Sequence, residues 1–262
     1  MKTTRYHLPA PSSRIRFKAA VVADLHDRPY GEILSVLEAE RPDLIFIPGD
    51  LTEWLTGGIS SPRSGLGLLS ACAAIAPTYY SLGNHEIGAC HGRLYRSKLS
   101  GQDAPPPYVM PSRWKKTIAE SGAVLLDEAF VVHEHPATGK LVIGGLGSGL
   151  LHPAGAPDLS WVESFARTEG YKILLCHHPE YFDRYLRPYP IDLILSGHAH
   201  GGQWRIFGRG VYAPDQHLFP KYTSGVHEGR LVISRGVANT VSPIPRFFNR
   251  REVVVVECGM KA

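Results

Sequence analysis

Short runs of side chains that can bind metal ions recur at five places along the chain. Carboxylate, imidazole and amide groups gather there without any cysteine inside the runs, which argues against a structural zinc cage. Such mixed nitrogen and oxygen donors suit borderline divalent ions such as Mn, Fe or Zn better than Ca. The runs are Asp24-Leu25-His26, Gly49-Asp50, Gly83-Asn84-His85, His177-His178 and Gly197-His198-Ala199-His200.

Each run directly follows an apolar segment of strand length. In open α/β sheets, ligands bind in the crevice beyond the carboxyl ends of the strands, so we expect the five runs to converge there. Two residues in a strand-end segment separated by one point to the same side, which explains the spacing of His198 and His200. The strands expected are residues 17–23, 44–48, 78–82, 172–176 and 191–196.

The remaining pattern indicates a mixed sheet architecture in one domain, residues 1–262. Helical spacing of apolar residues predicts helices at 31–40 and 66–76, so the chain begins as a βαβ unit. Segments 130–133 and 141–146 flank a Pro- and Gly-containing turn and predict an antiparallel hairpin. Late strands are expected at 231–234 and 253–256. We expect residues 1–14 to be irregular and 88–112 to form an irregular excursion, a candidate lid.

The ordered set of runs resembles the calcineurin-like metallophosphoesterase family from Asp24 to about Glu252. The segments 196–203 and 246–249 are similar to those of a subgroup of small bacterial enzymes, although Ala199 and Arg251 stand where that subgroup often has threonine and proline. The resemblance implies a four-layer αββα sandwich, in which two mixed β-sheets are flanked by helices.

The same resemblance implies a role for each candidate residue. Asp24, His26 and His200 would hold a first metal ion, and Asn84, His177 and His198 a second. Asp50 would bridge the two ions, and a hydroxide held between them would attack phosphorus. His85 would protonate the leaving oxygen or stabilise the transition state. His178 also follows a strand, but the family places the ligand one residue before an x-Pro pair, which favours His177.

The expected activity is hydrolysis of a phosphodiester or, less favoured, a phosphomonoester, since a monoester dianion needs additional positive charge beside the metals. The alternative is a metal-binding interaction scaffold without catalysis. Scaffolds on this fold tend to lose ligands or the active-site histidine, and this chain has all seven ligands and His85. Three arginines near the end of the chain are candidate phosphate contacts: Arg246, Arg250 and Arg251.

Composition narrows the partners and the compartment. The formal net charge is +4, without a block of like charges, so we expect a small phosphate ester as the partner and no nucleic acid. No apolar run reaches the length of a membrane helix and the N-terminus lacks a signal sequence, so we expect no stable membrane anchor. Four widely spaced cysteines form no disulfide framework, which favours the cytoplasm. The sequence does not fix the oligomeric state.

Overall fold

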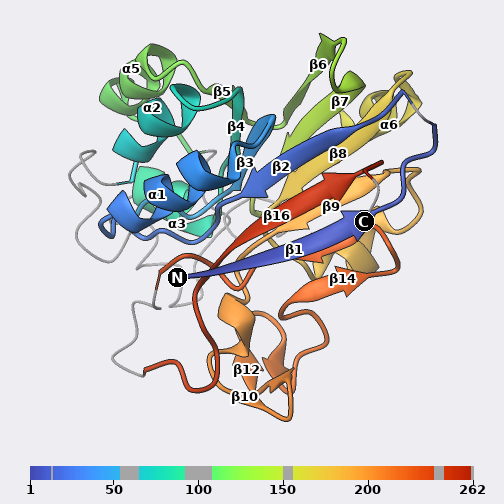
Figure 1. Cartoon of the computed structure of the whole chain (residues 1–262). Coiled ribbons are helices and arrows are strands. Elements are labelled where there is room, and N and C mark those ends of the chain that lie inside the picture. Colours follow the sequence, from blue (N-terminus) through green and yellow to red (C-terminus); the bar gives the residue numbers. More distant parts are fainter. Residues whose placement is uncertain (13, 54–64, 92–107, 150–155, 239–244, 261–262) are drawn as a thin grey trace.

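Two six-stranded sheets pack against each other in the computed structural model, which describes residues 1–12, 14–53, 65–91, 108–149, 156–238 and 245–260 (Figure 1). The first sheet has the order β1 (Lys2–Leu8), β16 (Glu252–Cys258), β2 (Phe17–Val21), β3 (Leu44–Pro48), β4 (Thr78–Ser81) and β5 (Val124–Leu126). The second has the order β14 (Gly225–His227), β15 (Leu231–Ile233), β9 (Leu193–Ser196), β8 (Tyr171–Cys176), β7 (Gly139–Leu146) and β6 (Ala129–His135).

Helices cover the outer face of each sheet, so the molecule has the four layers expected from the sequence. The first sheet is covered by α1 (Gly31–Glu40), α2 (Gly67–Ala73), α3 (Asn84–His91) and α5 (Ser112–Glu120). The second sheet is covered by α6 (Val162–Arg167) and the π-helix η2 (Phe182–Leu186). The predicted mixed fold of two sheets flanked by helices is confirmed.

Alternation along β2 shows why its sequence is apolar throughout. Phe17, Ala19 and Val21 pack into the core between the sheets. Ala20 and Val22 pack on the opposite side, against the helices. Because successive side chains of a strand point to opposite faces, a strand buried on both faces must be apolar at every position. The β3 strand, whose five residues are all buried, obeys the same rule.

Several local expectations hold and two fail. The β2–α1–β3 unit is parallel and the β6–β7 hairpin is antiparallel, as predicted. Residues 1–14 are not irregular, because Lys2–Leu8 forms β1 and pairs in parallel with β16. The excursion expected at 88–112 is wrong at its start, where residues up to His91 continue α3. The lid itself would involve residues 92–107, which lie outside the described residues.

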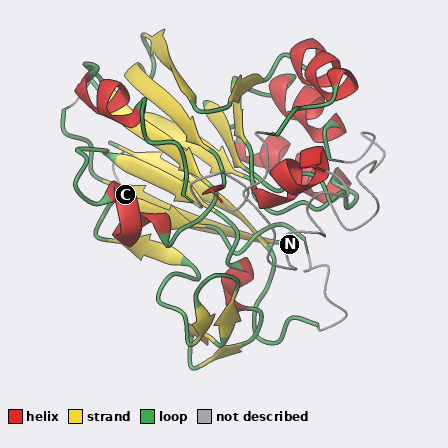
Figure 2. Cartoon of the chain, turned by 180° about the vertical axis from the view of Figure 1, so that it is seen from behind, coloured by secondary structure: helices red, strands yellow, loops and turns green. Residues whose placement is uncertain are grey.

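Two small hairpins project from the sandwich below the carboxyl ends of the central strands (Figures 1 and 2). The first pairs β10 (Arg205–Ile206) with β11 (Arg209–Gly210), and the second pairs β12 (Tyr212–Ala213) with β13 (His217–Leu218). They follow the short 3-10 helix η3 (His200–Gly202). Within the described part of the chain, none of the helices has the length and apolarity needed to cross a bilayer.

Candidate metal centre

Loops after five parallel strands meet at one edge of the sandwich and bring all five sequence runs together. Backbone hydrogen bonds join neighbouring loops: Asp24 N donates to Gly49 O at 3.3 Å, and Gly197 N donates to His177 O at 3.1 Å. The first sheet supplies the runs after β2, β3 and β4, and the second supplies those after β8 and β9. The candidate site therefore lies at the seam between the two sheets.

Candidate ligands at this seam have an uncommon backbone conformation. Positive φ angles are costly for residues with a side chain and concentrate at functional sites. Among the candidates, the angle is 59° at Asp24, 51° at His26, 56° at Asp50, 65° at His198 and 46° at His200. Turning the chain sharply after each strand is what aims these side chains toward one another.

Asp24, His26 and His200 form one group whose ligand atoms lie within 4.8 Å of one another, and all three are buried. His200 Nε2 lies 3.2 Å from His26 Nε2 and 3.9 Å from Asp24 Oδ1. Burial and the neighbouring His26 and Arg246 hold the pKa of His200 well below its ordinary value, so its imidazole is neutral at pH 7. A neutral imidazole is the form that binds a metal ion.

Asp50, His177 and His198 form the second group. His177 Nδ1 lies 2.7 Å from the carbonyl oxygen of Pro48 and must donate to it, because a carbonyl only accepts. This bond fixes the tautomer and leaves Nε2 of His177 facing Asp50 Oδ2 at 3.0 Å. Such an outer hydrogen bond is the usual way to orient a metal-binding histidine.

Asp50 lies between the two groups. Its Oδ2 is 3.0 Å from His177 Nε2 and 3.9 Å from His26 Nε2, while its Oδ1 accepts a hydrogen bond from the backbone of His85 at 2.9 Å. Burial alone would raise the pKa of Asp50, but the positive fields of His177 and His85 outweigh it and lower the pKa well below the ordinary range. The carboxylate is therefore ionised and faces both groups.

Gly83 and Glu86 hold Asp50 in place. A Cβ atom on Gly83 would lie 2.1 Å from Asp50 Oδ1, so no other residue fits at this approach. The buried Glu86 carboxylate accepts backbone hydrogen bonds from Asp50 at 2.9 Å, Thr52 at 2.9 Å and Gly83 at 2.8 Å. Glu86 thus clamps the loops after β3 and β4 together. Asn84 follows Gly83 and starts α3, and its buried Oδ1 makes no hydrogen bond within the described structure.

His85 lies beside this pair of groups and is oriented by Glu53. Its Nδ1 is 3.0 Å from Glu53 Oε1, and its Nε2 is 3.8 Å from Asp50 Oδ2. Burial lowers the pKa of His85, but the charges of Asp50 and Glu53 outweigh burial and raise it above the ordinary value. The imidazole can therefore carry a proton at neutral pH. Glu53 was not among the residues predicted from the sequence.

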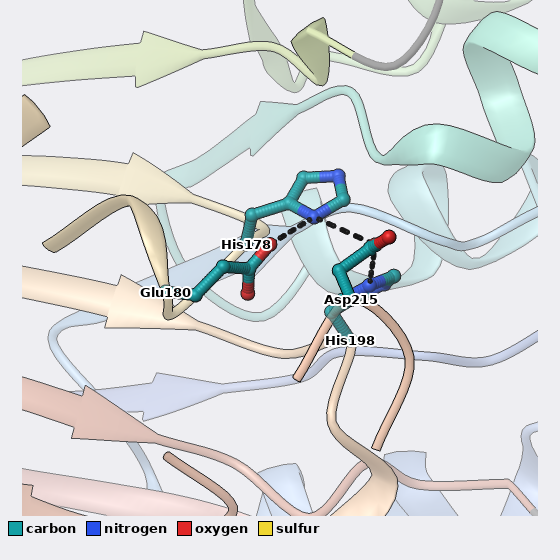
Figure 3. A group of neighbouring side chains, drawn as sticks. All are labelled: His178, Glu180, His198 and Asp215. Atoms are coloured by element: carbon teal, nitrogen blue, oxygen red, sulfur yellow. Dashed lines mark hydrogen bonds and ion pairs between the residues drawn. The ribbon is translucent and has the colours of Figure 1, made fainter. Parts of the chain in front are cut away.

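A second carboxylate, Asp215, orients His198. Figure 3 shows Asp215 directed at both His198 and His178, and Glu180 approaches the same ring nitrogen of His178 as Asp215 does. His198 Nε2 lies 2.9 Å from Asp215 Oδ2, which leaves Nδ1 of His198 as its nitrogen for a metal ion. The hydrogen bond from His198 lowers the pKa of Asp215 to about 2, against an opposing effect of burial. Asp215 comes from the turn between β12 and β13 and was missed by the sequence analysis.

His178 takes a different position from its neighbour His177. Its Nδ1 lies 3.0 Å from Glu180 Oε1, and its Nε2 lies 2.7 Å from Ser148 Oγ. It groups with Glu180, His198 and Asp215 rather than with Asp50. Both ring nitrogens of His178 therefore have partners within the protein, whereas His177 directs one toward the candidate metal site.

Arg246 touches the first group from the late part of the chain. Its Nη2 lies 3.0 Å from His200 Nδ1, and its Nη1 donates to the carbonyl oxygen of Arg235 at 2.7 Å. Because a guanidinium only donates, Nδ1 of His200 accepts here. A metal ion on Nε2 would require the proton on Nδ1, so Arg246 has to turn away from His200 when an ion binds at that nitrogen.

Comparison with known proteins assigns the chain to a family. The family model described as calcineurin-like phosphoesterase matches residues 17–202, and the chain belongs to that family of metal-dependent phosphoesterases. The matched range contains the seven candidate metal ligands and His85, and it ends before Asp215 and the candidate phosphate contacts Arg246, Arg250 and Arg251.

Individual relatives share less than 30% sequence identity with this chain. The uncharacterized metallophosphoesterase Cj0846 of Campylobacter jejuni is 28% identical over 235 residues, which are 89% of this chain and 55% of that protein. The phosphodiesterase YaeI of Escherichia coli is 27% identical over 238 residues, which are 85% of this chain and 76% of that protein. The solved structure of the sulfate thiohydrolase SoxB of Thermus thermophilus is 13% identical, with a TM-score of 0.48 over 95% of this chain and 57% of that chain. This chain thus spans about half the length of Cj0846 and of SoxB.

Proposed function

We propose that the chain hydrolyses a phosphodiester with two divalent transition-metal ions, Mn, Fe or Zn. The observation that carries this proposal is the position of Asp50, a buried carboxylate facing His26 on one side and His177 on the other. A carboxylate between two imidazole groups is suited to bridging two cations. Family membership supports the metal dependence, and the number and identity of the ions belong to the proposal.

The residues fit such a pair of ions. Buried polar atoms need partners, and several at this site make no hydrogen bond within the described residues. These atoms are Asp24 Oδ2, His26 Nδ1 and Asn84 Oδ1. In the proposal, Asp24, His26 and His200 bind the first ion and Asn84, His177 and His198 the second, with Asp50 shared.

Two bound cations would activate a water molecule and neutralise the phosphoryl oxygens. In the proposal, His85 donates a proton from Nε2 to the leaving oxygen, and the charges of Asp50 and Glu53, which raise its pKa against the effect of burial, favour the protonated form. Glu53 fixes the ring by accepting from Nδ1 and keeps Nε2 directed toward the Asp50 side of the site. Removing His85 therefore removes the proton donor and leaves the proposed ligands in place.

A diester is favoured over a monoester on charge. Two divalent ions carry more positive charge than Asp24 and Asp50 neutralise, and the surplus matches a hydroxide and the monoanion of a diester. A monoester dianion would need a further cation beside the two ions. The similar protein YaeI is a phosphodiesterase, which is consistent with this preference. The second candidate function is a metal-binding scaffold without catalysis.

The test is a side-by-side assay of bis(p-nitrophenyl) phosphate and p-nitrophenyl phosphate, with metal content measured by mass spectrometry on the same samples. We expect two ions per chain, faster diester cleavage, loss of activity with EDTA and recovery with Mn. Two bound ions without turnover of either ester would support the scaffold, and one ion at saturation would refute the dinuclear centre.

We extend the proposal to a small phosphate ester as substrate and to the cytoplasm as compartment. All four cysteines are free, and three of them, Cys72, Cys176 and Cys258, are buried. Burial raises the pKa of the Cys72 thiol to about 12, so this group is not a reactive thiolate. Free thiols support a reducing compartment.

A further inference from the structure

Exposed apolar side chains concentrate on one projecting part of the molecule. Of the eleven large hydrophobic residues that are exposed in the described structure, eight lie in residues 204–219 or 247–248. We call five of these the apolar tip; they come from the β10–β11 hairpin and the segment beside it. The apolar tip consists of Trp204, Ile206, Phe207, Phe247 and Phe248.

Contacts show that the tip is continuous. The rings of Trp204 and Phe247 lie 5.8 Å apart between centroids, and Arg205 N donates to Phe247 O at 3.0 Å. Phe207 and Phe248 line the same hollow of about 410 Å³, together with Ile206. The hairpin carrying most of these residues stands away from both sheets (Figures 1 and 2).

Two phenylalanines of the apolar tip are exposed to solvent and have an unfavourable backbone conformation. The relative exposure is 102% for Phe207 and 89% for Phe248. Their φ angles are 48° and 54°, in the left-handed region that bulky residues seldom adopt. Asparagine would be better at both positions on both counts. Since these side chains do not stabilise the described fold, they are suited to contact something outside it.

A basic pocket adjoins the apolar tip and shares Phe248 with it. The pocket has a volume of about 730 Å³ and four cationic side chains in its lining, with no carboxylate among the lining residues. Glu32 approaches from the edge, where its Oε2 lies 3.3 Å from Arg251 Nη2. The lining consists of Met1, Lys2, Arg246, Phe248, Asn249, Arg250 and Arg251. The pocket therefore presents positive charge beside the apolar tip.

We propose that the apolar tip and the basic pocket together dock on the surface of an anionic lipid bilayer. The aromatic side chains would enter the boundary between headgroups and acyl chains, and lipid phosphates would occupy the basic pocket. Apolar insertion and electrostatic attraction are the two contributions that reversible surface binding requires. Docking of this kind needs neither a spanning helix nor a polybasic tail.

Charge distinguishes this occupant from a second copy of the chain. A twofold contact through the apolar tip would use the same surface on both copies and would bring Arg250 and Arg251 of one toward those of the other. Like charges meeting at an interface are unfavourable. An anionic bilayer instead offers both an apolar layer for the tip and phosphates for the arginines.

The docking surface is continuous with the candidate metal centre. Asn249, in the pocket lining, donates from Nδ2 to the carbonyl oxygen of His200 at 2.7 Å, and Arg246 contacts the His200 ring. A lipid phosphate held in the pocket would thus lie one side chain away from His200. Vesicle binding is measured without turnover, so the docking proposal can fail independently of the proposed phosphoesterase activity.

The test is flotation of the full chain with vesicles of phosphatidylcholine alone or mixed with phosphatidylglycerol. We expect binding to the mixed vesicles, with release at high salt. The double variant Phe207→Asn/Phe248→Asn should bind at least about tenfold more weakly, since two buried aromatic contacts are lost. Val109→Asn is the matched control, because Val109 is 72% exposed and lies three residues before α5. Figure 1 shows α5 at the opposite end of the molecule from β10. This control should bind as the wild type does.

A charge variant provides a second arm. Arg250 is exposed, and Arg250→Glu should abolish the preference for phosphatidylglycerol. Wild-type protein that ignores both vesicles, or a double variant that binds unchanged, overturns the proposal. The proposal is also overturned if the wild type forms a concentration-dependent dimer in sedimentation and the double variant does not, because that result assigns the apolar tip to a contact with a second copy. If the double variant has a lowered Tm, the test depends on Arg250→Glu. An unchanged preference of Arg250→Glu for phosphatidylglycerol then overturns the proposal.

Discussion

Replacing Asp215 by asparagine tests whether a residue outside the family match tunes the metal centre. Asp215 Oδ2 accepts from His198 Nε2 at 2.9 Å, and the substitution keeps the shape of the side chain while removing its charge. Hydrogen bonds to charged groups contribute about 1.5 to 3 kcal/mol. The Asp215 side chain is 40% exposed, so solvent screening places the loss near the lower end. About 1.5 kcal/mol corresponds to about a tenfold loss of affinity.

The loss should be confined to one of the two ions. His198 shares its group with Asp50 and His177, whereas Asp24, His26 and His200 form the other group. Titration of the metal-free protein with Co²⁺, followed by visible absorption and calorimetry, resolves the two steps. Asp215→Asn should weaken one step about tenfold and leave the other unchanged.

Asp183→Asn is a matched control. The pKa of Asp183 is also lowered to about 2, with Lys221 and Arg187 opposing the effect of burial, but it has no candidate ligand as a partner. Its Oδ2 lies 2.7 Å from Lys221 Nζ at the surface of η2. The reasoning is refuted if Asp215→Asn binds both ions as tightly as the wild type, or if Asp183→Asn produces the same loss.

Three further outcomes are expected. His85→Ala should keep both ions by mass spectrometry and reduce kcat on bis(p-nitrophenyl) phosphate by about 10² to 10⁴-fold, the usual contribution of a general acid; a loss of metal would make it a ligand instead. Gly83→Ala should lose metal and lower Tm, because its Cβ would lie 2.1 Å from Asp50 Oδ1; unchanged metal content would contradict this geometry. Burial, followed by the field of His198, lowers the pKa of His178 to about 4. Its unfolded value is near 6.5, so the unfolded state takes up more protons as the pH falls. The neutral ring therefore contributes stability that is fully present above about pH 6.5 and is lost as the pH falls toward 4, by roughly 3 kcal/mol at most. Urea unfolding of metal-free protein across this range should show the decline, and His178→Gln should show less of it.

The central strands and the runs that follow them could be predicted because one physical rule governs both. A strand buried on both faces must be apolar, so β3 was visible as Leu44–Pro48, and the polar residue that ends the run marks the sheet edge. Neighbouring parallel strands end at the same edge of the sheet, so the proximity of Asp50 and Asp24 can be predicted from the strands alone.

The missed features lack this regularity. Only Leu8 of β1 is buried and most of its other side chains are polar, so no apolar pattern marks the strand. Its partner β16 lies at the other end of the chain, as the pairing of Lys2 with Glu252 shows. Asp215 lies in a turn between two strands of two residues each, too short for any periodicity. Its approach to His198 depends on how the projecting hairpins fold back, which is a property of tertiary packing alone.

The position of the candidate centre at the seam has a mechanical consequence. Asp24 and Asp50 extend from the first sheet, while His177 and His198 extend from the second, and the hydrogen bond from His177 to Pro48 already ties the two layers together. Ions bound by both sets of side chains would cross-link the two sheets. The free energy of ion binding would then add to the free energy of unfolding. Chelation should therefore weaken the packing between the two sheets before either sheet itself unfolds.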